Sequence, residues 1–210
     1  MAKRILPYRD YSEHDVVNLF SLDTSAYTIA DAKSNAAAGN AFDSGVVVSV
    51  SAGELPGEVS NLRAASTNDL RDYLGASFDG AHIGFNAYPE NGMTVAPASA
   101  GGRGLGITLR ETLAYDENGE KMLYYKQKLD EYQAVLPGQT VPVLTRGLVL
   151  LSGDAIIGTP SQGTPLEIGA NGKLQEETTG IVVGTVLAVG TDIVKGKPGS
   201  QTKYLCKVSF

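Results

Sequence analysis

The stretch VPVLTRGLVLLSG, from Val141 to Gly153, is the most apolar and β-branched part of the chain outside its C-terminus. A polar Thr-Arg-Gly step divides it into two apolar runs, VPVL and LVLL. Each run is continuous and short, which favours a buried strand over a helix. We therefore expect both runs to lie in the core, with Leu148 and Leu150 buried.

Glycines and prolines in and around this stretch predict how the chain turns. Proline at 137 pre-sets one turn position and Gly138 tolerates positive φ at the next. Gly147, inside the stretch, indicates a bulge or a close backbone approach. Asn171-Gly172 predicts a hairpin between strands at 163–169 and 173–175, because a type I′ turn needs positive φ at both central residues.

The remaining periodic segments predict more strands and two short helices. We expect strands at 45–51, 106–113, 181–190 and 204–210. Tyr125, Leu129 and Tyr132 recur at i, i+4 and i+7, which predicts a surface helix over 126–133. A second amphipathic helix is expected within 61–77, and residues 79–104 are typical of a long loop.

These patterns predict a mainly β protein. We expect a compact antiparallel β-sandwich or barrel-like body with one or two short helices and an extended N-terminal arm. The arm would comprise residues 1–25, a loop-rich β/α region residues 26–105, and the β-rich body residues 106–210. The last two regions could also form one domain.

The arm carries apolar and aromatic residues before any core is evident in the sequence. Ser12 could cap a helix there, or residues 16–22 could form a strand. The arm either packs on its own domain or reaches a neighbouring subunit. For the second case, the candidate binding residues are Tyr8, Tyr11, Val16, Val17, Leu19 and Phe20.

The composition limits the classes of partner. The net charge of −6 argues against nucleic-acid binding, which needs clustered excess Lys and Arg. No apolar run approaches the roughly 20 residues of a membrane span, and the first 15 residues lack a signal-peptide core. The lone Cys206 cannot form an intramolecular disulfide. We expect a soluble protein made in a cytoplasm.

Residues with catalytic or ligating chemistry are few and scattered. His14, His82 and Cys206 do not have the spacing of a metal site, so we expect no metal. The Gly-rich stretch 101–106 precedes a strand rather than a helix, which favours a loop over a phosphate site. The acid pairs 116/117 and 176/177 lie in expected turns and should be solvated. We therefore expect no catalytic residues, no cofactor and no enzyme activity.

Three runs in the expected body, YDENGEK (115–121), VPVLTRGLVLLSG (141–153) and VVGTVLA (182–188), resemble tailed-bacteriophage capsid decoration (cement) proteins. The run YSEHDVVNLF (11–20) is similar to the start of one group of them. The resemblance covers the arm and about residues 106–210. It implies a structural virion protein on the capsid exterior, made in the bacterial host cytoplasm, that locks major capsid protein subunits together. It also implies a homotrimer whose extended arm pairs with shell loops.

Three other functions remain open. A host- or glycan-binding module on the phage head would be favoured by exposed aromatic residues, for which the 79–104 region offers Phe85 and Tyr88. A capsid-associated hydrolase would need a clustered acid/base site. A major capsid protein is a further class, for which the chain is short.

Overall fold

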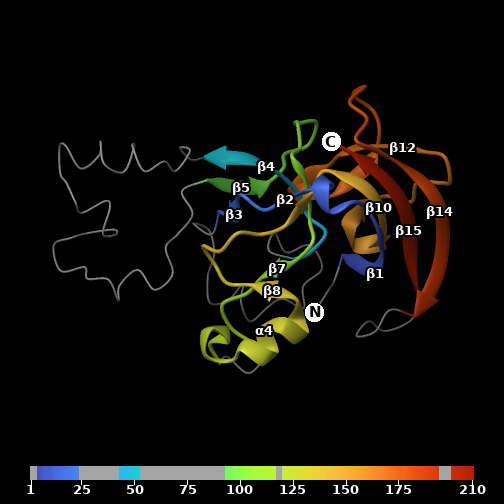
Figure 1. The fold of residues 1–210 in the computed structure, drawn as a ribbon. Coiled ribbons are helices and arrows are strands. Elements are labelled where there is room, and N and C mark those ends of the chain that lie inside the picture. The colour runs from blue at the N-terminus through green and yellow to red at the C-terminus, as the bar shows by residue number, and fades with distance from the viewer. Residues whose placement is uncertain (1–3, 24–42, 53–92, 117–119, 194–199) are drawn as a thin grey trace, which may run out of the picture.

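Strand β10, the second half of the opening stretch, lies inside a seven-stranded sheet of a computed structural model, which describes residues 4–23, 43–52, 93–116, 120–193 and 200–210 (Figure 1). Neighbouring strands of this sheet are antiparallel except for the last pair, which is parallel. In spatial order the strands are β1 (Ile5–Asp10), β10 (Arg146–Ser152), β15 (Ser200–Ser209), β14 (Gly184–Ile193), β12 (Pro165–Ile168), β13 (Leu174–Glu176) and β11 (Ile156–Ile157).

The first half of the stretch, β9, belongs to a second sheet of six strands. These pairs are also antiparallel, except that β3 runs parallel to β5. Their spatial order is β2 (Val16–Val17), β9 (Val143–Leu144), β6 (Gly106–Thr108), β4 (Val47–Ala52), β5 (Thr94–Pro97) and β3 (Ser21–Leu22).

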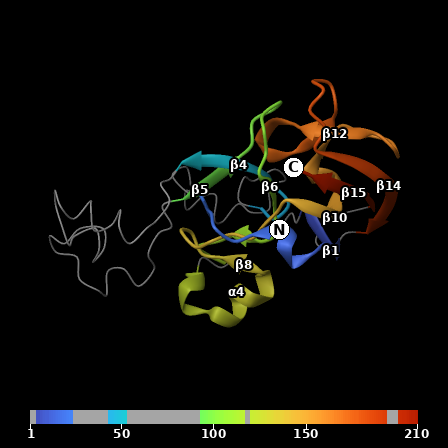
Figure 2. The same cartoon turned by 45° about the horizontal axis from the view of Figure 1, so that its top comes forward.

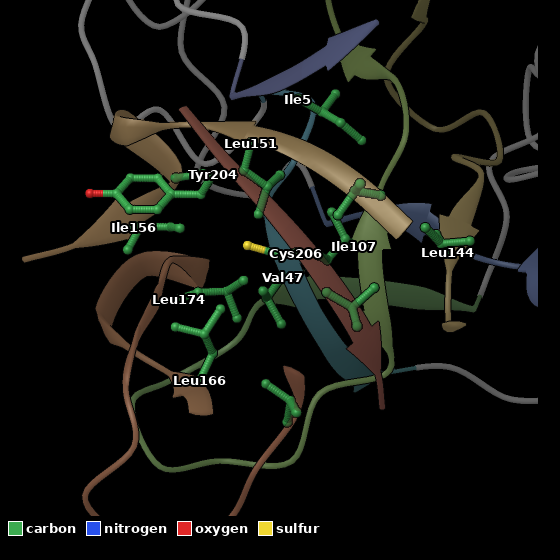
Figure 3. Close-up of a cluster of buried hydrophobic side chains, with 14 of the residues drawn as sticks. Ile5, Val47, Ile107, Leu144, Leu151, Ile156, Leu166, Leu174, Tyr204 and Cys206 are labelled. Atoms are coloured by element: carbon green, nitrogen blue, oxygen red, sulfur yellow. The ribbon is translucent and has the colours of Figure 1, made fainter. Parts of the chain in front are cut away.

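One apolar cluster joins the two sheets. Figure 3 shows Leu151, Cys206 and Leu166 of the larger sheet together with Val47 and Ile107 of the smaller one. All five side chains are buried. The fold is therefore mainly β, as expected, and its sheets stay open instead of closing into a barrel. The described parts of 26–105 share this core with the expected body.

The burial of β10 corrects the expectation for its leucines. Val149 and Leu151 are fully buried in the shared core, whereas Leu148 and Leu150 are half-buried. Successive side chains of a strand point to opposite faces, and only one face of this sheet covers the core. The run is continuously apolar although the strand is buried on one face.

Two glycines take the conformations that the sequence predicts. Gly147 has φ of 154°, and a Cβ there would lie 2.6 Å from Cβ of Tyr11, so the backbone approach is close. Gly138 has φ of 82°, and the amide of Gln139 donates to the carbonyl of Leu136 at 3.0 Å, which closes the turn.

The expected hairpin after the opening stretch is also present. Asn171 and Gly172 have φ of 56° and 62°, inside the short turn η5 (Ala170–Gly172) that connects antiparallel β12 and β13. Strands β14 and β15 form a second, longer hairpin (Figure 1). Strand β14 begins at Gly184 rather than at residue 181, and Val182 is exposed.

A small unit with its own apolar cluster lies beside the two sheets. It contains α4 (Lys126–Tyr132), close to the predicted helix, and η3 (Met122–Tyr124). It also contains the short parallel pair β7 (Glu111–Thr112) and β8 (Ala134–Val135). The expected strand over 106–113 is thus two strands, because β6 pairs in the smaller sheet and β7 pairs with β8. Figures 1 and 2 both show α4 below the sheets.

Part of the expected loop at 79–104 is a strand. β5 (Thr94–Pro97) pairs along β4, and Val95 is fully buried. The loop expectation missed this strand because it spans only four residues and contains a proline. The helix expected within 61–77, and Phe85, Tyr88 and His82, lie outside the described residues.

The N-terminal segment, residues 4–23, runs through both sheets instead of standing apart (Figure 2). β1 lies at the edge of the larger sheet, and β2 and β3 lie at opposite edges of the smaller one. Between β1 and β2, η1 (Glu13–Asp15) forms a single turn capped by Ser12, whose hydroxyl accepts from the amide of His14 at 3.3 Å. Residues 4–23 thus pack on their own domain, which is one of the two alternatives that the sequence leaves open for the arm.

Candidate functional site

The six candidate residues of the N-terminal segment fall into two groups. Tyr8 and Leu19 are 55% and 56% exposed. The other four are half-buried: Tyr11 and Val16 pack against the shared core, Phe20 packs against a second cluster in the smaller sheet, and Val17 lies in β2. The exposed pair is thus available to a partner, and the other four help to hold the segment in place.

Backbone hydrogen bonds fix this segment at several points along its length. The carbonyl of Arg4 accepts from the amide of Ser152 at 2.7 Å. The carbonyl of Asp15 accepts both the amide and the hydroxyl of Thr145, at 2.8 and 2.9 Å. The carbonyl of Phe20 accepts from the amide of Val141 at 2.8 Å. The opening stretch therefore holds the segment from one end to the other.

A buried arginine anchors the start of the segment. Arg4 is fully buried, and its Nε lies 3.8 Å from Oδ2 of Asp43, which is also buried. Its Nη1 is 3.5 Å from the carbonyl of Asn171. Burial lowers the pKa of Arg4, and the carboxylate of Asp43 acts in the opposite direction. The ion pair connects the N-terminal segment with residue 43, and the hydrogen bond to Asn171 connects it with the η5 turn.

A groove of about 690 Å³ opens beside the segment. We call it the N-terminal groove. It is lined by residues of the N-terminal segment and by residues between Leu109 and Pro142. Its apolar lining residues are Val16, Leu109, Val135 and Pro142, and its other lining residues are Arg9, Tyr11, Glu13, Asn18, Arg110, Asp130, Gln133 and Thr140.

Four charged side chains line the N-terminal groove without pairing with one another. Arg9 and Glu13 come from the N-terminal segment, Arg110 directly precedes β7, and Asp130 lies in α4. Within the part of the chain that the structure describes, neither arginine forms an ion pair or a side-chain hydrogen bond. Arg9 is half-buried, whereas the other three are exposed. The arrangement can bind a ligand that has both apolar and charged groups.

Outside the groove, Glu167 is a buried carboxylate with a full set of donors. It accepts from Nε2 of Gln175 at 2.6 Å, from the hydroxyl of Thr178 at 2.8 Å, and from the amide and hydroxyl of Thr179 at 2.9 and 2.6 Å. These bonds, those from Thr179 and Gln175 first, lower the pKa of Glu167 well below its ordinary range. The Glu167 carboxylate thus holds the segment after β13 against β12. Its role is structural.

Asp116 belongs to one of the two acid pairs that we expected to be solvated, but it is buried. Asp116 accepts from Nζ of Lys128 at 2.5 Å and from the amide of Glu120 at 2.8 Å. These donors allow the carboxylate to be buried, so the expectation of a solvated Asp116 is wrong. The hydrogen bond to Asp116 raises the pKa of Lys128. Glu176 is exposed, as expected, Glu177 is half-buried, and residue 117 lies outside the described residues.

The described residues contain no group of three or more His, Cys, Asp or Glu that could hold a metal ion. His14 is exposed, and Cys206 is buried in the shared core. Burial raises the pKa of the Cys206 thiol to about 12. The thiolate is therefore scarce at neutral pH, and this cysteine is a core residue.

The Gly-rich stretch at 101–106 is a packed connection between β5 and β6. The amide of Gly101 donates to the carbonyl of Ile168 at 2.9 Å, and the amide of Leu105 donates to that of Val48 at 2.7 Å. A Cβ at Gly104 would lie within 3.0 Å of side chains of both sheets. The glycines here permit close packing.

Sequence reasoning found Tyr11 and Val16 but missed the rest of the N-terminal groove. Arg9, Tyr11 and Glu13 alternate along the chain, and this alternation could have indicated that they share one side of a strand. Arg110 and Asp130 lie about a hundred residues further along the chain, and no local signal in the sequence indicates that they line the same groove.

The chain matches no protein-family profile, no curated protein and no solved structure. None of the helices in the described residues is long and apolar enough to cross a membrane.

Proposed function

We propose that this protein is a structural component of a tailed-bacteriophage virion. It binds the outside of the capsid and stabilises contacts between major capsid protein subunits, and it catalyses no reaction. The observation that carries the proposal is the exposure of Tyr8 and Leu19 on a segment that is fixed in both sheets. The resemblance of residues 11–20 and 115–188 to capsid decoration proteins supports the same function.

Fixed, exposed apolar side chains suit a protein that binds by surface contact. A few large side chains carry most of the binding free energy of an interface, and tyrosine is enriched among them. Holding such a side chain in place before binding reduces the entropy that association costs. Tyr8 on β1 meets both conditions, and Leu19 between β2 and β3 meets the second.

The net charge of −6 supports an exterior position. A protein on the inner surface of the shell would face packaged DNA, whose phosphates repel an acidic surface. We propose that the protein is made in the cytoplasm of the bacterial host and associates as a homotrimer on the shell. A ligand that binds only the assembled state stabilises it by mass action at every occupied site.

Cosedimentation with capsid shells tests this proposal. Expanded shells that lack the protein should bind it, and unexpanded shells should not. Tyr8→Ser and Leu19→Ser should each weaken binding at least about tenfold, because each removes an exposed apolar contact. Tyr124→Ser is the matched control, because Tyr124 is 73% exposed in η3, outside the N-terminal segment.

Shell stability provides the second readout. Shells depleted of the protein should rupture at a lower temperature than complete shells, and adding it back should restore them. If depleted shells withstand heat and osmotic shock as well as complete shells do, the proposal fails.

One observation favours the host- or glycan-binding alternative. Tyr124 and Tyr125 are adjacent and exposed, at 73% and 46%, and Nζ of Lys128 lies 5.7 Å from the centre of the Tyr125 ring. Aromatic faces with a nearby polar group are common in ligand sites. Loss of attachment of the phage to host cells in Tyr124→Ser, with shell binding unchanged, would support this alternative.

A further inference from the structure

The turn between β12 and β13 contains a dipeptide with chemistry of its own. In an Asn-Gly pair, the amide nitrogen of glycine can attack Cγ of the asparagine, because glycine has no side chain to hinder it. The bond from Cγ to the side-chain nitrogen breaks, and that nitrogen leaves as ammonia with the amide proton. Water then opens the succinimide ring to give aspartate or isoaspartate. The chain has three such pairs, at 91–92, 118–119 and 171–172, and the structure describes the third.

The backbone of Asn171 holds the reacting atoms apart. Ring closure requires the nitrogen of Gly172 to eclipse Cβ of Asn171 about the bond from Cα to the carbonyl carbon. Asn171 has φ of 56° and ψ of 39°. At this ψ the nitrogen is nearly anti to Cβ, because the bonds at Cα are tetrahedral. The side chain is exposed to water, so it is the backbone conformation that prevents the reaction.

Three contacts keep this peptide from rotating into the reactive conformation. The amide of Gly172 donates to the carbonyl of Ala98 at 3.1 Å. Nη1 of Arg4 donates to the carbonyl of Asn171 at 3.5 Å. Gly172 is buried so closely that a Cβ there would lie 2.5 Å from the carbonyl oxygen of Val47. Rotation of the peptide would break both hydrogen bonds and displace the glycine from this fit.

Arg4 links the turn to the N-terminal segment. Its guanidinium is fully buried, with Nε 3.8 Å from Oδ2 of Asp43. Its backbone carbonyl accepts from the amide of Ser152 in β10 at 2.7 Å. Because the side chain and the backbone of Arg4 are held together in this way, the guanidinium and the start of the segment leave the fold together. Release of the segment therefore removes the donor from the carbonyl of Asn171 and loosens the peptide.

We infer that Asn171 is a deamidation site that the fold keeps closed and that release of the N-terminal segment opens. Isoaspartate adds a methylene to the main chain before Gly172, and the close fit of this glycine leaves no room for a displaced backbone. Modification thus makes a reversible opening of the segment permanent. The inference does not depend on the proposed function.

Peptide mapping by mass spectrometry, on the full-length protein aged in mildly alkaline buffer, tests this inference. In guanidinium chloride, the three Asn-Gly pairs should convert at similar rates, which gives an internal reference. In the folded protein, conversion at Asn171 should be at least about tenfold slower than in guanidinium chloride, because it passes through an opened state of small population. Equal rates at Asn171 in the two conditions would overturn the inference.

A variant tests the part played by the N-terminal segment. Arg4→Gln should speed conversion at Asn171 in the folded protein by about threefold or more, since losing one hydrogen bond shifts the opening equilibrium by such a factor. Arg146→Gln, which removes an exposed arginine at the start of β10, is the matched control and should convert at the wild-type rate. An Arg4→Gln variant that folds and converts no faster than this control contradicts the inference.

A measurement on the wild type covers the case in which Arg4→Gln does not fold. Hydrogen exchange at the amide of Ser152 reports the release of Arg4, whose carbonyl it binds. In low concentrations of guanidinium chloride, conversion at Asn171 should rise together with exchange at Ser152. If Asn171 converts while the Ser152 amide stays protected, the segment does not control the site and the inference fails.

Discussion

Leu151 lies on the inner face of β10, where it meets the core that both sheets share, and Leu150 points to the opposite face. In the register of β10 with β15, Leu151 is opposite the buried Tyr204, and Leu150 is opposite the half-buried Leu205. The two leucines therefore form a matched pair with the same chemistry and different burial.

We predict that Leu151→Ala lowers the free energy of unfolding by about 2–5 kcal/mol, because it leaves a cavity in the core. Leu150→Ala should cost about 1 kcal/mol, since the side chain is half-solvated in the native state. Urea denaturation of both variants measures the difference. Equal losses at the two positions would mean that the core does not lie on the Leu151 face.

Local chemistry explains which single residues could be predicted from the sequence. Gly147, Gly138 and Asn171 were identifiable because a turn or a close approach demands a particular backbone conformation. The burial of Asp116 was not identifiable, because it depends on Lys128, twelve residues away in α4. Arg9 was missed for a similar reason, since the groove that it lines depends on contacts far along the chain.

At the scale of elements, Glu167 of β12 accepts four hydrogen bonds, one from Gln175 within β13 and three from Thr178 and Thr179 in the chain after β13; we call these donors the cage around Glu167. Every one of these bonds ends on a carboxylate oxygen, so the cage is complete only while Glu167 is ionised. The folded state holds the pKa of this group below its unfolded value. Its contribution to stability is therefore full above the ordinary glutamate pKa, about 4.3, and is lost as the pH falls further.

We predict that Glu167→Gln lowers the melting temperature at pH 7 and reduces its dependence on pH between about 5 and 3. A glutamine amide would direct its own donors at those of Thr178 and Thr179. The melting temperatures of the variant and the wild type should converge as the pH falls. Glu176→Gln, in the adjacent strand and exposed, is the control. A parallel pH dependence in wild type and Glu167→Gln would contradict the role of the cage.

Elements with a strong local signal were predictable, and the shortest strands were not. The spacing of Tyr125, Leu129 and Tyr132 predicted α4, and Asn171-Gly172 predicted the β12–β13 hairpin. β2, β3, β7 and β8 have two residues each, which is too short to carry a period. Their strand conformation comes from the partner strand, so it appears only in the assembled fold.

At the scale of the whole molecule, the N-terminal segment connects the two sheets. Removing residues 1–10 would take β1 from the edge of the larger sheet and Ile5 from the shared core, and would leave the buried Asp43 without Arg4. We predict that this deletion lowers the melting temperature by at least about 5 °C. Tyr8→Ser, on the same strand and exposed, should leave it unchanged within about 1 °C. A deletion variant that melts with the wild type would show that the segment is dispensable for folding.

The register of β4 and β5 also has a practical consequence. Ala52 pairs with Thr94, so the chain leaves the smaller sheet at one position and re-enters it one strand spacing away, about 5 Å. Any insert whose ends can meet across that spacing is compatible with the pairing of β4 and β5. The entropic cost of a longer insert rises only slowly with its length. This junction is therefore a place where an engineer can insert a foreign sequence. Under the proposed function, each copy of the protein would display that sequence on the capsid.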